Sequence, residues 1–475
     1  MTSSDLPPTI FVLFGATGDL SRRMVLPAFY DLARRDLLPK QWQLIGNGRG
    51  DVSHEDFAGR VRDALEEFGP LGGAGDDTAG PWEDFRQGLR FAGGGFASDD
   101  PGSLLDVIAE AKDELGEDVQ FVHYLAVPPE AFEGLTRGLH EHGLTDRARV
   151  VYEKPYGTSP ESFRELDDLV LSVLAEEQVF RIDHFLGKEG TQELHVLRFA
   201  NRLFEQVWGR EHVQQVQIDV PETLDVAQRA SFYDATGATL DMLVTHLFQV
   251  AAEVAMEPPV SMKPEDLQDA REAVLAAFRP LAKEDVVLGQ FEGYTDIEGI
   301  ADDSQTDTFV AARLWVDTDR WHGVPFLLRT GKRMAQSEQR VSLVLRKPDG
   351  PVTQLPGHGN VLSLSVAGPG AVDVRMVTKE PGPDLTLAEA TSSLSLCDVP
   401  GGDPLPPYVS LIHDVVIGDR SLFTTSAGQS SAWRAVAPLL EDRPPVQPYA
   451  PDSWGPVAAN ELAGPGGWLL GQTED

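Results

Sequence analysis

An apolar run that stops at a glycine turn constrains the fold of this chain more than any other feature. Residues 9–18 read TIFVLFGATG, and the apolar stretch ends at Gly15. Apolar side chains then recur at helical spacing in GDLSRRMVLPAFYDLARRDLL, interrupted by Pro27. A buried strand, a glycine turn and a helix in this order can hold a pyrophosphate. The glycines allow the backbone to come close, and the helix N-terminus offers unpaired N–H groups.

The residues around this turn indicate which dinucleotide would bind. Leu13 occupies the first usual glycine position, so only Gly15 and Gly18 match the fingerprint. NAD needs an acid at the end of the second strand, whereas the 2′-phosphate of NADP would be repelled by one. That strand end reads GNGR, and Arg49 offers a guanidinium to the phosphate. We therefore expect NADP, with a solvated turn arginine and dual use of NAD as alternatives. The expected cofactor-binding residues are Gly15, Gly18, Asp19, Leu20, Arg49 and Lys154.

Strands and helices alternate through the first 180 residues. Apolar runs at 119–129 and 149–157 are separated by a helical pattern at 130–142. Such alternation predicts a Rossmann-like, doubly wound parallel sheet. We therefore predict a dinucleotide-binding domain over residues 1–180.

The pattern changes after residue 180. Alternating apolar residues predict strands that form a largely antiparallel sheet, with helices among them. We predict an α+β domain over 181–475 for substrate binding and dimerisation, with a Pro/Gly-rich segment beyond 440 that wraps the surface. The expected strands are 213–220, 308–316, 324–332 and 340–347.

Composition narrows the classes of partner. The formal net charge of −36 repels nucleic acid and anionic membranes, so an anionic ligand needs a local cationic pocket. The most apolar segment, 239–256, contains Asp241, His246 and Glu253, and therefore predicts a buried helix and no membrane span. A single cysteine excludes an intramolecular disulfide, and no secretory signal is evident. We expect a cytoplasmic protein without a metal site.

Several segments then occur together in an order typical of one family. The set resembles the glucose-6-phosphate dehydrogenase family over residues 9–460, and the motifs EKPYG and RIDHFLGKE are its most specific parts. The segments are GATGDLSRR, HYLAVPP (123–129), EKPYG (153–157), RIDHFLGKE, LRFANRLF (197–204), DMLVTHLFQ (241–249), AMEPP (255–259), VVLGQFEGY (286–294) and GVPFLLRTGKR (323–333).

This resemblance implies a reaction and a set of residues. The reaction is oxidation of C1 of glucose 6-phosphate to 6-phosphogluconolactone with hydride transfer to NADP, the first step of the oxidative pentose phosphate pathway. By the same match, His246 is the catalytic base and Asp183 its carboxylate partner, with Pro155 expected in a cis peptide. A homodimer or homotetramer is also implied. The implied substrate-binding residues are Lys154, His184, Lys188, Glu222, Asp234 and Lys332.

The sequence also departs from the family pattern, mainly around the phosphate. Phe185 replaces a tyrosine and Ser337 a cation, which together could remove about 3–6 kcal/mol of phosphate binding. Arg333 and Arg340 are candidates to compensate. Two alternatives therefore remain open, a same-fold dehydrogenase of another sugar or sugar phosphate and a catalytically weak paralogue that acts by binding. Further departures are Met24, Leu240, Thr245 and Ala367.

Overall fold

A computed structural model describes residues 6–71, 79–226, 229–352, 355 and 359–471 of the chain. The chain forms two compact units. The first comprises residues 1–187, 263–268 and 406–426, and the second comprises 188–262, 269–405 and 427–475.

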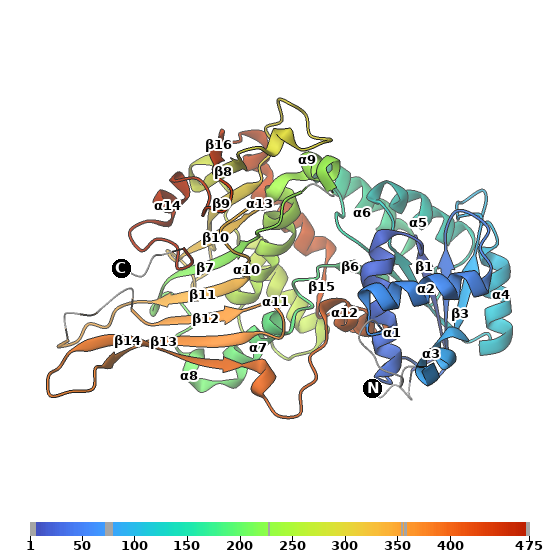
Figure 1. Ribbon diagram of the computed structural model, residues 1–475, viewed down its shortest axis with the longest axis horizontal. Coiled ribbons are helices and arrows are strands. Elements are labelled where there is room, and N and C mark those ends of the chain that lie inside the picture. Colours follow the sequence, from blue (N-terminus) through green and yellow to red (C-terminus); the bar gives the residue numbers. More distant parts are fainter. Residues whose placement is uncertain (1–5, 72–78, 227–228, 353–354, 356–358, 472–475) are drawn as a thin grey trace. The chain divides into compact units, whose positions relative to one another are not determined.

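The first unit contains a seven-stranded sheet with helices on its two faces (Figure 1). Six strands pair in parallel in the order β3-β2-β1-β4-β5-β6, which is the strand order of a Rossmann fold. The predicted doubly wound sheet is thereby confirmed. Every residue of β1 is buried, as expected where helices cover both faces. The strands are β1 (Thr9–Phe14), β2 (Trp42–Asn47), β3 (Leu89–Ala92), β4 (Gln120–Leu125), β5 (Ala148–Tyr152), β6 (Val179–Ile182) and β15 (Phe423–Thr424).

The seventh strand comes from a distant part of the chain. β15 pairs antiparallel with β6, through Phe423 beside Ile182 and Thr424 beside Arg181. The predicted boundary at 180 therefore falls inside β6, and the first unit takes up residues that a division into 1–180 and 181–475 assigns to the second domain. The physical reason is that β6 would otherwise leave an unpaired edge.

Side-chain caps explain where two helices of the first unit begin. The Ser53 hydroxyl accepts from the Asp56 N–H at 3.0 Å at the start of α2, and Ser159 caps α6 in the same way, with Pro160 at its first position. The helices are η2 (Ser21–Val25), α1 (Leu26–Arg34), α2 (His54–Phe68), α3 (Ala79–Arg86), α4 (Leu104–Leu115), η4 (Pro129–Ala131), α5 (Phe132–Glu141), α6 (Pro160–Val173), η5 (Glu176–Gln178) and α12 (Pro407–Ile417).

The second unit is built on a nine-stranded sheet in the order β14-β13-β12-β11-β7-β10-β9-β8-β16. Six neighbouring pairs are antiparallel, and only β10–β7 and β16–β8 are parallel, which confirms the predicted mainly antiparallel sheet. β13 and β14 form the long hairpin drawn in orange in Figure 1. The strands are β7 (Val213–Pro221), β8 (Val286–Phe291), β9 (Phe309–Trp315), β10 (Pro325–Gly331), β11 (Arg340–Leu345), β12 (Val361–Ser365), β13 (Ala371–Lys379), β14 (Leu387–Ser395) and β16 (Val446–Tyr449).

Helices complete the second unit. The predicted helix over 239–256 is present as a π-helical segment, η7, continued by α10. The helices are α7 (Glu189–Ala200), α8 (Arg202–Glu205), α9 (Ala230–Ala238), η7 (Thr239–Leu247), α10 (Phe248–Ala255), α11 (Pro264–Ala276, whose first residues lie in the first unit), η8 (Lys283–Asp285), η9 (Tyr294–Asp296), η10 (Leu396–Asp398), α13 (Ser426–Glu441) and α14 (Ala458–Ala463).

The C-terminal segment does more than wrap the surface. β16 adds an edge strand in parallel with β8, and Tyr449 and Trp468 lie buried in a hydrophobic cluster with Phe309. The prediction of a surface wrap was wrong for these residues, because their large apolar side chains gain stability only by burial. Among the described residues, no helix has the length and apolar character needed to cross a membrane.

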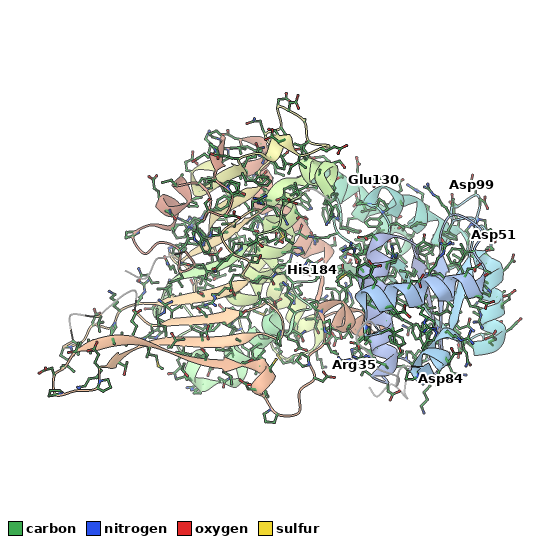
Figure 2. All side chains as sticks on the ribbon, in the orientation of Figure 1. Arg35, Asp51, Asp84, Asp99, Glu130 and His184 are labelled. Carbon is green, nitrogen blue, oxygen red and sulfur yellow. The ribbon has the colours of Figure 1, made fainter. Side chains whose placement is uncertain are left out.

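The acidic surplus lies on the surface of the first unit as well as elsewhere. Asp51, Asp84, Asp99 and Glu130 are all exposed and are labelled in Figure 2. These four carboxylates are solvated, so their charges cost little in desolvation.

Candidate active site

The glycine turn of the first unit has a geometry that only glycine can adopt. Gly15 has φ of +75°, and a Cβ there would collide with the carbonyl oxygen of Ala126, just after β4. The Gly15 carbonyl accepts from the Gly18 N–H and from the Ser21 hydroxyl, both at 2.9 Å. The turn is therefore a tight backbone cradle at the carboxyl ends of β1 and β4, where dinucleotides bind in such sheets.

A helix follows the turn, as the spacing of apolar residues predicts. It contains a π-helical segment, η2, before the longer α-helical part that starts at Leu26. Asp19 forms an exposed ion pair with Arg23 at 2.8 Å. Leu20 precedes η2 directly and is half-buried.

The end of β2 carries the residues that would face the adenosine side of a cofactor. The Asn47 carbonyl accepts from the N–H groups of Gly15 and Ala16, and the Asn47 side chain donates to the carbonyls of Ala92 and Gly95. Arg49 is exposed. A cavity of about 270 Å³ adjoins the turn, and its lining includes Thr17, Arg22 and Arg60. The glycine cradle and these guanidinium groups fit an anionic dinucleotide.

Lys154 follows the end of β5 in the EKPYG motif. The Lys154–Pro155 peptide bond is cis, as predicted from the resemblance. The neighbouring Glu153 is buried and accepts a hydrogen bond of 2.6 Å from the Tyr124 hydroxyl. Burial raises the pKa of Glu153, although hydrogen bonds from Tyr124 and Tyr408 oppose that rise.

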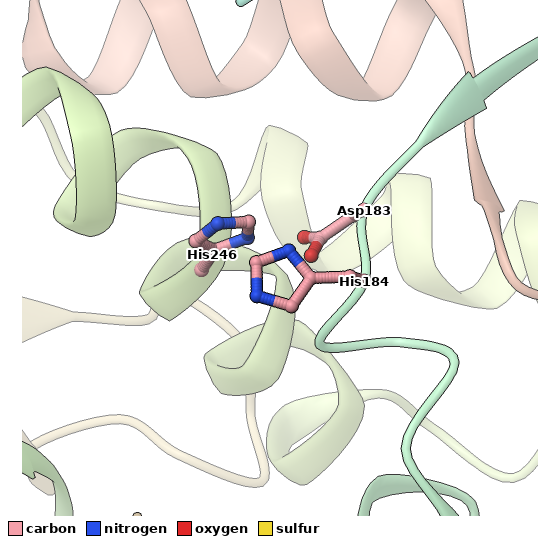
Figure 3. A group of neighbouring side chains, drawn as sticks. All are labelled: Asp183, His184 and His246. Carbon is pink, nitrogen blue, oxygen red and sulfur yellow. The ribbon is translucent and has the colours of Figure 1, made fainter. Parts of the chain in front are cut away.

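β6 and the segment after it carry two kinds of charged residue, one that holds the strand and one that is a candidate for function. Arg181 is buried and pairs with Asp167 at 2.7 Å and with Glu176 at 2.9 Å, so its role is to hold β6. Asp183 is 1% exposed, and its Oδ1 accepts from the Phe185 N–H at 2.8 Å, which fixes the carboxylate. Figure 3 shows Asp183 and His184 on this segment, and His246 on η7.

The base candidate sits in a widened helix. η7 carries His246, which is completely buried, and the Thr245 hydroxyl donates to the Leu240 carbonyl at 2.7 Å. The substitution at 245 therefore satisfies a backbone carbonyl within the π-helix, whereas the Leu240 side chain takes no part in this bond. Asp183 and His184 belong to the first unit and His246 to the second, so the pairing of Asp183 with His246 stays a prediction.

One of the predicted sugar-binding residues, Lys332, lies at a cavity of the second unit. This cavity has a volume of about 310 Å³, and Lys332 contributes to its lining. The Lys332 ammonium donates to the Glu222 carboxylate at 2.6 Å. The other lining residues are Leu224, Asp225, Val226, Arg229, Phe232, Tyr233 and Asp241.

Asp241 is a residue that sequence reasoning placed only in a buried helix. It lines the cavity, whereas Asp234, the predicted sugar ligand, accepts hydrogen bonds from the hydroxyls of Tyr294 at 3.0 Å and Ser304 at 2.5 Å. The available signal was the five-residue spacing to His246, which puts two side chains on one face of a π-helix but not of an α-helix. A π-helix has no reliable sequence signature, so this spacing was not informative in advance.

Lys188 and several departures from the family pattern are the residues predicted to lie near a substrate phosphate. Lys188 is buried at the start of α7 and donates to the side-chain oxygen of Gln339. Ser337 accepts from the Thr223 N–H at 2.9 Å, and Arg340 lies 3.7 Å from Asp373 and 3.8 Å from Glu338. Arg340 thus lies within ion-pair distance of two carboxylates. The aromatic ring of Phe185 is buried, Met24 is exposed, and Ala367 is half-buried.

Comparisons with known proteins match nearly the whole length of this chain. The family model for the glucose-6-phosphate dehydrogenase NAD binding domain matches residues 12–193, and that for the C-terminal domain of the same enzyme matches 195–468. Glucose-6-phosphate 1-dehydrogenase 2 of Mycobacterium tuberculosis is 38% identical, covering 96% of this chain and 93% of the relative. Glucose-6-phosphate 1-dehydrogenase of Gluconobacter oxydans is 36% identical, covering 96% of each.

Solved structures agree with these matches. Glucose-6-phosphate 1-dehydrogenase from Mycobacterium avium has a TM-score of 0.87 at 32% identity, covering 99% of this chain and all of the other. A glucose-6-phosphate dehydrogenase in complex with its substrate glucose 6-phosphate has a TM-score of 0.90 at 29% identity, with the same coverage. The protein described here therefore belongs to the glucose-6-phosphate dehydrogenase family.

Proposed function

We propose that this protein is an NADP-dependent glucose-6-phosphate dehydrogenase that produces 6-phosphogluconolactone in the first step of the oxidative pentose phosphate pathway. The observation that carries the proposal is the cavity of the second unit, where Lys332 and Asp241 line one space and Asp241 shares its helix with His246. Oxidation of a pyranose requires groups that hydrogen-bond the sugar and a base, and here the cavity supplies the first while the helix of Asp241 carries the candidate base.

The chemistry assigned to this chain is removal of a proton. The imidazole of His246 takes the proton of the C1 hydroxyl, while the hydrogen on C1 leaves as a hydride. Bound NADP would supply the acceptor for that hydride. The carboxylate of Asp183 orients the imidazole and stabilises the imidazolium that forms. The hydrogen bond from the Phe185 N–H keeps this carboxylate in one orientation.

Substrate recognition divides between hydroxyl and phosphate groups. Asp241 and the Glu222–Lys332 pair contact the sugar hydroxyls, and we assign to Asp241 the role that the sequence suggested for Asp234. His184 and Lys188 bind the phosphate, and Lys154 lies between sugar and cofactor. These cations attract a phosphate dianion within a protein whose overall field repels it.

The preference for NADP over NAD is part of the proposal. It is supported by an exposed Arg49 where NAD-binding proteins have an acid, whereas the glycine turn would hold the pyrophosphate of either cofactor. Changing Arg49→Ala is expected to raise the KM for NADP at least tenfold and to leave the KM for NAD unchanged. An equal effect on both cofactors would contradict the assignment of Arg49 to the 2′-phosphate.

The central test is reduction of NADP measured at 340 nm with a panel of sugars. We expect turnover with glucose 6-phosphate, and we expect His246→Asn to reduce kcat by about 10³-fold or more, because the base contributes that order of acceleration. NADP binding, measured by fluorescence titration, should be unchanged. His212→Asn, at an exposed position outside the cavity, is the matched control. If turnover survives in His246→Asn, His246 is not the base.

A second candidate function is a dehydrogenase of another sugar. It is favoured because few groups are available to bind the substrate phosphate. Phe185 has no hydroxyl, Ser337 is bonded to Thr223, and Arg340 faces two carboxylates. We expect an affinity for glucose 6-phosphate that is about 10²–10⁴-fold weaker than a complete clamp gives. The double variant Phe185→Tyr with Ser337→Arg should lower the KM for glucose 6-phosphate and leave that for unphosphorylated glucose unchanged. A KM that is low already in the unmodified protein contradicts this part.

Assembly and location are proposed at the same level. We propose a homodimer or homotetramer formed through the sheet of the second unit, supported by the exposed apolar side chains of Met376, Leu385 and Leu394 on the β13–β14 hairpin. We also propose a cytoplasmic location, with which the exposed free thiol of Cys397 is consistent. Sedimentation velocity of the protein, compared with a Met376→Lys and Leu394→Lys variant, tests the assembly.

A further inference from the structure

Helix η7 carries both Asp241 and His246, and it begins at a break in the chain. Gly237 has φ of +63°, which separates α9 from η7. A helix that restarts in this way has N–H groups without acceptors in its first turn. The residue that precedes η7, Ala238, provides no side-chain acceptor for these N–H groups. The acceptor therefore has to come from elsewhere in the fold.

Asp307 supplies these acceptors from the segment before β9. Its carbonyl accepts from the Ala238 N–H at 2.7 Å, and its Oδ2 accepts from both the N–H and the hydroxyl of Thr239, each at 2.7 Å. A carboxylate is well suited to this place because the N-terminus of a helix carries partial positive charge. Asp307 thus does the work of an N-cap residue, although it is distant in sequence from the helix.

Asp307 is itself held in place on both sides. Its side chain is 1% exposed, and the Arg443 guanidinium binds its Oδ1. The next residue, Thr308, donates its N–H to the Gly289 carbonyl at 2.7 Å, which ties the segment to the sheet. A Cβ at Gly237 would come within 2.7 Å of Asp307 Oδ1, so the packing leaves no slack at the break. The start of η7 is therefore fixed relative to β8 and β9.

We propose that Asp307 and Arg443 are positioning residues for the reaction, because they set where η7 begins and thereby where Asp241 and His246 point. This inference rests on the proposed function. Asp241 lies in the first turn of η7 and His246 near its end, so a rotation of the first turn displaces both groups together. A displacement of about 1 Å of a catalytic group can cost about 10²-fold in rate.

Two substitutions at Thr239 test the proposal with little change in volume. Thr239→Val removes the hydroxyl that binds Asp307, whereas Thr239→Ser keeps it. We expect Thr239→Val to lower kcat about tenfold and to leave the KM for NADP unchanged, and we expect Thr239→Ser to retain kcat. Thr236→Val is the matched control, because its hydroxyl donates to the Phe232 carbonyl in α9, on the other side of the break.

Asp307→Asn and Arg443→Lys extend the test to the pair itself. Asp307→Asn keeps the shape but loses the charge, and we expect kcat to fall about 10–100-fold with a displaced pH profile. Arg443→Lys, which keeps the cation, should retain more activity than Arg443→Met. Rates are normalised to folded protein from circular dichroism, so a loss of stability alone does not count as support.

The outcomes separate this inference from the proposed function. If the unmodified protein oxidises no sugar phosphate, the proposed function fails. If it does so, and Thr239→Val and Asp307→Asn retain kcat and the pH profile, Asp307 is a structural cap only and the inference is overturned. Should Asp307→Asn fail to fold, the comparison of Thr239→Val with Thr239→Ser decides alone.

Discussion

The two units place their important groups by different means. In the first unit the candidate cofactor site depends on the backbone, with Gly15 closing a turn against Ala126. In the second unit, segments are held in place by charged side chains that are distant in sequence. Arg329 pairs with Asp219, 110 residues away, and Arg443 pairs with Asp307, 136 residues away. A local backbone turn leaves a readable sequence signature, whereas a distant ion pair leaves none.

Buried charge in the second unit is extensive. The Arg329 guanidinium bonds Asp219 at 2.9 Å and lies over the rings of Trp454 and Trp468, with its central carbon 4.9 and 4.3 Å from their centroids. Glu253 accepts from His195 at 2.5 Å and from Arg271. Such groups are stable when buried only while every partner remains.

The largest expected effect concerns one of these pairs. Asp219→Ala leaves the buried Arg329 guanidinium without its carboxylate, and we expect the free energy of unfolding to fall by about 3–5 kcal/mol. Urea unfolding followed by tryptophan fluorescence measures it, since Trp454 and Trp468 contact Arg329. A loss below about 1 kcal/mol would remove the contrast between the units.

Acidification should affect the two units in different pH windows. Burial lowers the pKa of His123 in β4 from 6.5 to about 4, so its unfolded form binds a proton first and stability is lost as pH falls from about 6.5 to about 4. Burial opposes the charge of Glu253, yet Arg271 and His195 lower its pKa from 4.5 to about 2. Stability from Glu253 is therefore present above about pH 4.5 and lost toward pH 2. Each of the two pKa shifts corresponds to about 3 kcal/mol of the free energy of unfolding.

Deuterium labelling resolves these windows by region. The protein is equilibrated at each pH in urea and then pulse-labelled at one fixed pH, so that exchange reports the open fraction. We expect β4 peptides to open before α10 peptides as pH falls. His123→Gln should remove the upper window and Glu253→Gln the lower dependence. Opening of both regions in the same window for all three proteins contradicts the assignment.

Single-atom sensitivity of the backbone is the corresponding test for the first unit. Gly15→Ala forces an alanine to a φ of +75° and against the Ala126 carbonyl, so we expect a loss of about 2 kcal/mol and NADP binding weaker by tenfold or more. Gly50→Ala is the matched control, because φ is +100° and nothing lies within 4 Å of its Cβ. Equal loss of NADP binding in both variants would show that strain, not close approach, matters.

The smallest effect is expected from charges on the surface of the first unit. Arg62 and Glu66 pair at 2.9 Å on α2 with both side chains more than half exposed. Water screens this pair, so we expect Arg62→Ala to change the free energy of unfolding by less than about 0.5 kcal/mol. A thermal shift comparable to that of Asp219→Ala would show that burial is not what distinguishes the units.

The parallel and the antiparallel sheet could be predicted from the sequence, because periodicity and glycine turns are local signals. It missed β15 beside β6, since a two-residue strand has no period. It also missed Asp241 at the cavity, because the widened turn of η7 arises from packing. The partnership of Asp307 with Thr239 joins residues 68 apart and has no sequence signal.

The edge strand β15 has a consequence for how the chain is made. The first sheet is completed by Phe423 and Thr424, which a ribosome produces long after β6. The nascent chain must therefore carry an open sheet edge while most of the second unit is synthesised. A chaperone that covers such an edge would therefore increase the yield of the full chain more than that of a chain truncated before residue 423. Only the full chain can close the sheet and be released.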